Sequence, residues 1–265
     1  MFDYNGGLEM IKAVFFDFDD TLVSKKDHTM RENTEKAIKL LKKSGIIPII
    51  ATGRPKYTIN EYLDKLSINN AVFLNGHTVW LENKIIHDQI IDEDKARVMF
   101  ELAEKNDFSY GIINNDGTYL NLHPEKMNDL DVVDIEYMPQ KLEKRYIPGN
   151  CLWIFAGSRY DNILIETAEQ NNMRILRWNE AGVDIISKSV SKQTGVKILL
   201  ENLGIDFSEV VSIGDGDNDI ELLKASKIGI AMGNGSDNLK ECADMVTDSI
   251  DDDGVYKAMV KLGLI

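Results

Sequence analysis

The segment from residue 14 to residue 22 reads VFFDFDDTL and places three carboxylates, Asp17, Asp19 and Asp20, directly after a run of large apolar side chains. Each carboxylate raises the cost of ionising its neighbours, so this cluster needs a positive charge nearby. Mg²⁺ is a suitable partner because it binds carboxylate oxygens. A carboxylate beside it can attack phosphorus. A second carboxylate two residues along an extended chain points the same way and is placed for acid–base catalysis.

Three further polar clusters follow apolar segments. Each stands where a predicted strand ends: ATGR at 51–54, NGH at 75–77 and GDGDND at 214–219. In open parallel sheets, ligands bind at the carboxyl ends of the strands, so these clusters are predicted to meet at one edge. Asp17, Asp19 and Asp215 are suitable ligands for a shared cation, and the Thr52 hydroxyl and Gly53 N–H are suitable donors to phosphoryl oxygens.

Alternating strand and helix patterns must position these clusters. Residues 11–16, 46–51, 71–75 and 209–214 are predicted strands, and residues 31–45, 56–66 and 192–204 are predicted helices, which is typical of a parallel α/β sheet. Between these halves, hairpin patterns and isolated helices indicate an inserted α+β domain. We place the outer domain at 1–82 and 187–265 and the inserted domain at 83–186. Residues 1–9 are polar and are treated as an extension outside the fold.

Composition excludes several classes of function. Lys and Arg total 30 against 44 Asp and Glu, a net charge of −14 that argues against nucleic-acid binding. No apolar stretch approaches the roughly 20 residues that a membrane span needs, and residues 1–9 do not resemble a secretory signal. The two cysteines lack metal-ligand spacing, which favours a reduced, cytoplasmic protein.

Simpler interpretations of the clusters explain less. GDGDND is not a calcium loop, because the glycine and glutamate that such a loop needs at its sixth and twelfth positions are absent. It also lacks the third glycine of a dinucleotide-binding fingerprint. Taken singly, Asp17 and Asp19 could equally be helix caps or turn residues, and Asn75-Gly76 is first of all a turn signal. Only the four clusters together indicate a site.

Together the segments resemble the haloacid dehalogenase superfamily of phosphotransferases over about residues 10–262. FFDFDDTL resembles its first motif, IIATGR the second, VSKQTGVKILLENLG the third and SIGDGDNDIELL the fourth, in that order. NGH and AMGNGSDNLKECADMVTDSIDDDGV are similar to the Cof-type branch, whose members are mostly phosphatases of sugar phosphates and other small metabolites. The resemblance implies a Rossmann-like three-layer core with a parallel sheet and an inserted α/β cap.

The resemblance also implies roles for individual residues. Asp17 would be the nucleophile and a metal ligand, and Asp19 the acid–base, binding Mg²⁺ through its backbone carbonyl. Asp215 would be a side-chain metal ligand, and Asp219 would support the metal through its waters. The phosphate-binding positions would be Phe18 (through its N–H), Thr52, Gly53, Lys192 and Asn218. Candidate substrate contacts at the border of the pocket are Arg54, Asn75 and Gly76. Candidates in the inserted domain are Tyr110, Asn114, Asn121, Arg177, Trp178 and Asn179.

The sequence departs from the family pattern at two positions. Asp20 stands where the family usually has glycine; aspartate tolerates left-handed backbone better than most residues, so the turn can survive, and the effect on metal affinity is left open. Gln193 stands where glycine usually follows the family lysine, which leaves Lys188 as a competing candidate. We favour Lys192 because SKQTGVKILL aligns with the start of a predicted helix.

The sequence therefore predicts a Mg²⁺-dependent phosphatase that hydrolyses a small phosphorylated metabolite through an aspartyl-phosphate. A sugar phosphomutase would return the phosphoryl group to another hydroxyl, and a phospho-accepting signalling module would keep it. The inserted domain and Asp19 argue against the signalling module, since a receiver domain uses neither. The sequence does not specify the substrate or the oligomeric state.

Overall fold

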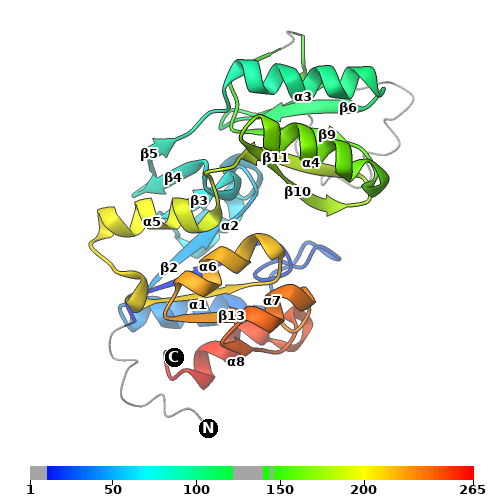
Figure 1. The fold of residues 1–265 in the computed structure, drawn as a ribbon. Coiled ribbons are helices and arrows are strands. Elements are labelled where there is room, and N and C mark those ends of the chain that lie inside the picture. Colours follow the sequence, from blue (N-terminus) through cyan, green and yellow to red (C-terminus); the bar gives the residue numbers. More distant parts are fainter. Residues whose placement is uncertain (1–10, 122–139, 144–145) are drawn as a thin grey trace. The chain divides into compact units, whose positions relative to one another are not determined.

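The computed structural model describes residues 11–121, 140–143 and 146–265. They form two compact units (Figure 1). The first unit comprises the chain up to Gly53 together with Glu61–His87 and Ser191–Ile265, and the second comprises Arg54–Asn60 and Asp88–Val190. The second unit is thus an insertion in the chain of the first. The predicted domain boundaries after residues 82 and 186 stay a prediction.

The first unit is built on a sheet whose described strands follow the spatial order β14-β13-β12-β1-β2-β3-β4-β5. These strands are β1 (Ala13–Phe16), β2 (Ile47–Ala51), β3 (Ala71–Phe73), β4 (Thr78–Leu81), β5 (Lys84–Asp88), β12 (Val210–Gly214), β13 (Ile228–Ala231) and β14 (Met245–Val246). From β14 to β3 the neighbours run parallel, and β4 is antiparallel to β3. The carboxyl ends of β1, β2, β3 and β12 therefore lie at one edge.

Helices cover both faces of this sheet (Figure 1). The helices of the first unit are α1 (Glu32–Lys43), α2 (Asn60–Leu66, whose first residue belongs to the second unit), α5 (Lys192–Leu203), α6 (Ile220–Ala225), α7 (Asp237–Cys242) and α8 (Gly254–Lys261). Helices α5 and α6 pack together on the side of Phe15, whereas α1 packs on β2 and against α8. Val14 and Phe16, which alternate with Phe15, are also fully buried. Strands covered on both faces read as continuous apolar runs, and the predicted three-layer α/β fold is confirmed.

The second unit has its own sheet and core. Its described strands follow the order β10-β11-β9-β6-β7-β8, antiparallel except for β7 beside β8. The elements are α3 (Glu93–Lys105), β6 (Ser109–Ile113), β7 (Thr118–Asn121), β8 (Gln140–Lys141), β9 (Cys151–Phe155), α4 (Asp161–Gln170), β10 (Met173–Asn179) and β11 (Gly182–Ser187). Phe100 of α3 and Leu164 of α4 are buried with alternate strand residues such as Leu152 and Ile154, as expected for an α+β unit.

The third predicted strand is shorter than expected. It ends at Phe73, because Leu74 and Asn75 adopt left-handed backbone (φ 52° and 55°) in a short 3₁₀ turn, Leu74–Gly76. In the hairpin of β4 and β5, Glu82 and Asn83 also have positive φ, as a two-residue hairpin turn requires. Other 3₁₀ turns cover Lys56–Thr58, Ser158–Tyr160, Phe207–Glu209, Asp217–Asp219 and Ile250–Asp252.

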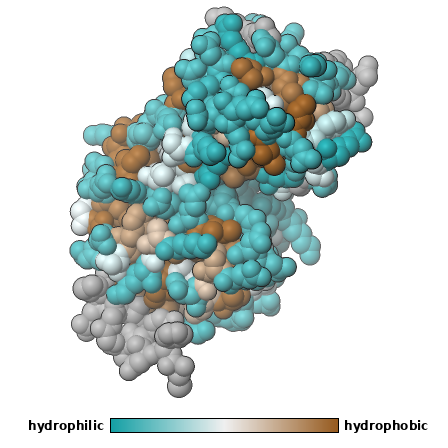
Figure 2. Space-filling view, viewed as in Figure 1, coloured by the Kyte–Doolittle hydropathy of each residue, from teal (hydrophilic) through white to brown (hydrophobic). Residues whose placement is uncertain are grey.

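Hydrophilic side chains dominate the face drawn in Figure 2, with apolar residues scattered among them. The exposed large apolar side chains include Ile85 and Ile86 of β5 and Ile163 and Ile165 of α4. None of the helices in the described part of the chain is long and apolar enough to cross a membrane.

Candidate active site

Asp17 and Asp19 lie in the turn that follows β1. The Asp17 N–H donates to the carbonyl of Ile213 in β12 (2.9 Å), which continues the register of the sheet, and Asp17 is 7% exposed. The chain then folds back, so that the Phe18 carbonyl accepts the Val23 N–H (2.9 Å). Asp19 is half-buried and forms an isolated bridge with Val23. The turn therefore holds both aspartates at the carboxyl edge of the sheet.

Asp20 adopts left-handed backbone (φ 55°), the conformation in which glycine is favoured. Its carboxylate accepts the Lys25 N–H (2.9 Å) and lies 3.4 Å from the Lys25 ammonium. The extra carboxylate is thus engaged by Lys25 within its own turn.

A second acidic turn follows β12. The Asp219 carboxylate folds back and accepts the N–H groups of Asp215 (3.2 Å) and Gly216 (3.1 Å), and Asp219 is 2% exposed. Gly214 allows this approach, because a Cβ there would lie 2.4 Å from the Asp219 carboxylate. The end of β12 thus requires glycine for a steric reason.

Lys192 enters the site from the first turn of α5. A capping box begins this helix: the Ser191 hydroxyl accepts the Thr194 N–H (3.2 Å), and the Thr194 hydroxyl accepts the Ser191 N–H (2.9 Å). Gly195 lets the helix pack closely on the turn after β3, since a Cβ there would lie 2.8 Å from the Gly76 Cα. The start of α5, and Lys192 with it, is thereby held by its cap and by this close packing.

The Lys192 ammonium bridges two buried carboxylates. It donates to Asp17 (2.5 Å) and to Asp219 (2.6 Å), and it is 1% exposed. Burial disfavours the ammonium, but Asp17 and Asp219 outweigh that effect and raise the pKa of Lys192. Burial raises the pKa of Asp17 well above its usual range, Lys192 opposes the rise, and the neighbouring carboxylates add to it. Burial, followed by the Asp219 charge, raises the pKa of Asp215 to about 6.

Among the described residues, Asp17, Asp215 and Asp219 form a group that could hold a metal ion. One carboxylate oxygen from each lies within 4.8 Å of the others. An all-carboxylate donor set fits a hard cation such as Mg²⁺. Burial is the main cause of the raised pKa values of Asp17 and Asp215, and a cation there would offset the carboxylate repulsion that adds to it. Asp20 is outside this group.

The second and third strands supply neutral polar groups. The fully buried Thr52 donates its N–H to the Val72 carbonyl (2.9 Å), and its own carbonyl accepts the Asn75 N–H (3.0 Å). The Asn75 side-chain oxygen accepts from the Asn218 amide (3.0 Å). A Cβ at Gly53 would lie 3.1 Å from the Asn75 amide nitrogen. One chain of contacts therefore joins β2, β3 and the turn after β12.

The remaining predicted site residues have varied positions. Phe18 is buried, with its ring edge-on to Tyr62 (centroids 5.1 Å apart). Gly76 has φ 108° and lies under α5. Arg54 belongs to the second unit. So does Lys188, whose exposed ammonium lies 3.8 Å from Glu169. Only Lys192 of the two candidate lysines contacts the acidic cluster, and the roles of all these residues stay predictions.

Most of the candidate contacts in the inserted domain have partners within their own unit. Tyr110 is buried and donates to Glu104 (2.9 Å); Asn114 accepts the N–H groups of the turn that follows it; Arg177 binds Asp161. The Trp178 indole donates to Asp184 (2.7 Å). These hydrogen bonds stabilise the second unit. The positions of these residues in the sequence did not indicate such partners. Asn121 is half-buried at the end of β7, and for Asn179 only the backbone, in β10, is described.

Two residues near the site were not singled out from the sequence. Thr21 is fully buried with its hydroxyl 3.5 Å from the Asp215 carboxylate. Asn234 donates to the Asp20 carbonyl (2.8 Å). Thr21 lies in the first motif, so its proximity was a usable signal. Asn234 lies in the segment beginning AMGNG that resembles the Cof-type branch, but nothing in that segment predicts its contact with Asp20.

The chain matches the model of the haloacid dehalogenase-like hydrolase family over residues 14–259. It belongs to this family. Among its relatives, a putative phosphatase of Bacillus subtilis, YkrA, is 27% identical over 256 residues, covering 96% of this chain and 98% of the relative. The recognition made from the four motifs is confirmed.

Solved structures of the family share the fold. A haloalkanoate-superfamily phosphatase from Bacteroides thetaiotaomicron, BT1666, has a TM-score of 0.88 and 30% identity, covering 98% of each chain. A sugar phosphatase of subclass IIB, BT4131, has a TM-score of 0.86 and 29% identity, covering 96% of this chain and 100% of that one. The predicted enzyme class, a phosphatase of this hydrolase family, is confirmed.

Proposed function

We propose that this family member is a Mg²⁺-dependent phosphomonoesterase that hydrolyses a small phosphorylated metabolite through an aspartyl-phosphate. The observation that carries the proposal is the meeting of three carboxylates and one buried ammonium at the carboxyl edge of the sheet. A nucleophilic carboxylate, a charge-balancing lysine and a donor set for a hard cation are the parts that phosphoryl transfer needs.

In the first half of the reaction, a carboxylate oxygen of Asp17 attacks phosphorus and the bond to the ester oxygen breaks. Asp19, two residues along, donates its proton to the departing oxygen. Lys192, the Thr52 hydroxyl and the Asn218 amide are donors for the phosphoryl oxygens. Asp17, Asp215 and Asp219 would hold Mg²⁺ directly or through its waters, with the Asp19 carbonyl as a further ligand. The ion would supply positive charge to balance that of the phosphoryl group.

In the second half, the Asp19 carboxylate takes a proton from the water that attacks phosphorus. The bond between phosphorus and Asp17 then breaks, inorganic phosphate leaves, and Asp19 is again protonated. The two halves restore both aspartates and consume one water. The relative named as a sugar phosphatase supports a sugar phosphate or a similar small ester as the substrate class.

The test is phosphate release from a panel of sugar phosphates and other phosphometabolites, measured with Mg²⁺ and with excess chelator. Release that depends on Mg²⁺ is expected, with one class of ester preferred. Isomerised sugar phosphate without free phosphate would replace the proposal with a phosphomutase. Phosphate that stays on the wild-type protein would replace it with a phospho-accepting module.

A further inference from the structure

The segment that follows β13 is fixed to the turn that carries Asp215. The Met232 N–H donates to the Gly214 carbonyl (2.9 Å), and the Ser236 N–H donates to the Asp215 carbonyl (2.8 Å). Between these bonds, Gly235 packs so closely that a Cβ would lie 3.1 Å from the Asp215 carbonyl oxygen. Residues 232–236 are therefore held against the second acidic turn, and the two segments form one rigid piece.

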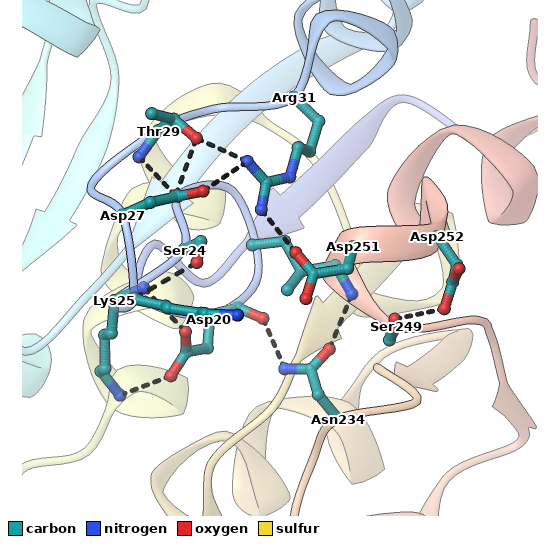
Figure 3. A network of polar contacts seen from close by, with 12 residues as sticks. Asp20, Ser24, Lys25, Asp27, Thr29, Arg31, Asn234, Ser249, Asp251 and Asp252 are labelled. Carbon is teal, nitrogen blue, oxygen red and sulfur yellow. Dashed lines mark hydrogen bonds and ion pairs between the residues drawn. The ribbon is translucent and has the colours of Figure 1, made fainter.

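The side chain of Asn234 extends from this segment to the first acidic turn. Its amide nitrogen donates to the Asp20 carbonyl (2.8 Å), and its oxygen accepts the Ile250 N–H (2.8 Å). Figure 3 shows both bonds meeting at one amide. Asparagine supplies a donor and an acceptor at once, whereas a carboxylate of the same size has no donor. The bond donated by Asn234 therefore joins residues 232–236, which are held against the second acidic turn, directly to the first acidic turn.

The peptide group that Asn234 holds lies one residue beyond Asp19. The other polar groups of Asp20 are also engaged: its N–H donates to the Val23 carbonyl (2.7 Å), and its carboxylate accepts the Lys25 N–H (2.9 Å). Together with the Asn234 bond, these contacts fix the direction of the backbone that follows Asp19. They do so although Asp20 adopts a strained, positive φ.

A second tie joins the same loop to the C-terminal part of the chain. The Arg31 guanidinium donates to Asp27 (2.8 Å) and Thr29 (2.6 Å) at the end of the loop, and to Asp251 (2.5 Å) beside the Ile250 peptide (Figure 3). Asp27 and Asp251 are exposed and Arg31 is only half-buried, so this tie contributes little energy. Of these two ties, the Asn234 bond lies closer to Asp19 along the chain.

We propose that Asn234 is a positioning residue that aligns Asp19 for proton transfer to the leaving oxygen. This inference rests on the proposed function, in which Asp19 is the general acid. A general acid acts only within hydrogen-bond reach of the oxygen that it protonates, so loosening the following peptide weakens that step. Asp17 is held separately, by Lys192 and by its bond to β12, so its attack on phosphorus should be affected less than the proton transfer.

The first experiment measures kcat/KM for phosphate monoesters whose leaving groups range from 4-nitrophenol to a simple alcohol. A good leaving group departs without a proton, so only esters of poor leaving groups need the aligned acid. For Asn234→Ala we expect a loss at least about tenfold larger with the alkyl ester than with the nitrophenyl ester. Asn234→Asp keeps the acceptor for Ile250 but loses the donor, so it should show the same selective loss.

Asn33→Ala is the matched control. The Asn33 amide also bonds to the C-terminal part of the chain, at Asp253 (2.7 Å), and it lies at the start of α1, beyond the turn after β1. Its kcat/KM should stay near the wild-type value with every ester. An equal loss on all esters in the Asn234 variants, or no loss, would overturn the inference.

The second experiment is hydrogen exchange of the peptide that covers residues 17–25, which needs no turnover. Exchange should be faster in both Asn234 variants than in the wild type and in Asn33→Ala. If wild-type protein releases no phosphate from any ester, the proposed function fails, and this exchange comparison still decides whether Asn234 holds the turn. Unchanged exchange would overturn the inference by itself.

Discussion

The Lys192 ammonium lies 2.5 Å from Asp17 and 2.6 Å from Asp219, and none of the three residues is more than 7% exposed. Removing one partner from a buried ion pair costs about 3–5 kcal/mol, because the remaining charge is left uncompensated. The lysine therefore serves two purposes: it stabilises the carboxylates in the folded protein, and in the proposed reaction it offers a donor to the phosphoryl group.

We expect Lys192→Ala to lower kcat at least about a hundredfold, because a preorganised charge on the transferring group is lost. It should also lower the melting temperature in the absence of Mg²⁺. Lys188→Ala is the matched control: Lys188 is exposed and paired with Glu169 in the second unit, so its kcat should be unchanged. Steady-state kinetics and thermal melts of both variants check this. The reverse ranking would reassign the phosphate-binding lysine.

The pKa of Asp215, raised to about 6 from 3.8, predicts a pH dependence of metal-free stability. The folded protein binds this proton more tightly than the unfolded chain does, so stability is lost as pH rises from about 4 to about 6. Mg²⁺ bound at Asp215, as proposed, displaces this proton, so the rise in melting temperature on adding Mg²⁺ should grow over the same range. Asp215→Asn should flatten both trends. A Mg²⁺ effect that is equal at about pH 4.5 and about pH 7 would contradict this.

Sequence reasoning works for residues whose chemistry is tied to a motif and fails for those that act through backbone contacts. Asp17 and Asp215 are indicated by residue type and position, Lys192 is indicated by the family resemblance, and the structure brings the three together. The Lys25 contact of Asp20 and the Asn234 contact depend on a turn with positive φ, whose hydrogen bonds no local pattern specifies. Asn234 follows β13, whereas its partner Asp20 follows β1. Only the fold shows that these two segments lie together.

At the scale of elements, α5 is positioned by a glycine as well as by its polar cap. A Cβ at Gly195 would lie 2.6 Å from the Val72 side chain and 2.8 Å from the Gly76 Cα. The helix can approach β3 only because this side chain is missing, and Lys192 begins the same helix. Helix packing and the position of the lysine are thereby coupled.

Gly195→Ala should destabilise the protein by about 1–3 kcal/mol through overpacking and lower kcat by moving Lys192. Gly204, at the other end of α5, is the control: it has φ 66°, and a Cβ added there would meet no described atom within 4 Å. Gly204→Ala should cost about 1–2 kcal/mol through backbone strain and leave kcat unchanged. Chemical denaturation and kinetics of the two variants separate the effects. A normal kcat in folded Gly195→Ala would show that Lys192 does not depend on this packing.

The parallel strands are well predicted because buried apolar runs alternate with amphipathic helices, whereas the short elements are not. The predicted strand at 71–75 stops at Phe73, where a left-handed turn takes over. The six-residue helix α7 carries too few residues for a clear period. Such elements are specified by tertiary contacts and by local caps such as the Ser236 hydroxyl at the start of α7.

At the scale of the whole molecule, each unit has a hydrophobic core of its own, and the group that could hold a metal lies within the first unit. A ligand that binds only folded protein stabilises against the openings that destroy its site. We therefore expect Mg²⁺ to slow hydrogen exchange in β1 and β12 but not in β6 and β9. Equal protection of both sheets would contradict this, because the two units would then unfold together.

The insertion of one unit in the other was visible as a change of pattern along the chain. The motifs do not predict the substrate, because substrate recognition depends on side-chain geometry that motifs do not encode. Tyr110 and Arg177, for example, each bind a partner within the second unit, and their role as substrate contacts stays a prediction.

In the proposed reaction the Asp17 carboxylate attacks phosphorus, and trapping the covalent adduct is the direct test of this step. Asp19→Asn should still accept a phosphoryl group from an aryl phosphate, whose leaving group needs no proton, but should hydrolyse the adduct slowly. After Mg²⁺ and aryl phosphate are added and the mixture is quenched in acid, peptide mass spectrometry should find stoichiometric phosphate on Asp17. Phosphate release by the wild type with no adduct on Asp17, together with normal turnover by Asp17→Asn, would show that Asp17 is not the nucleophile.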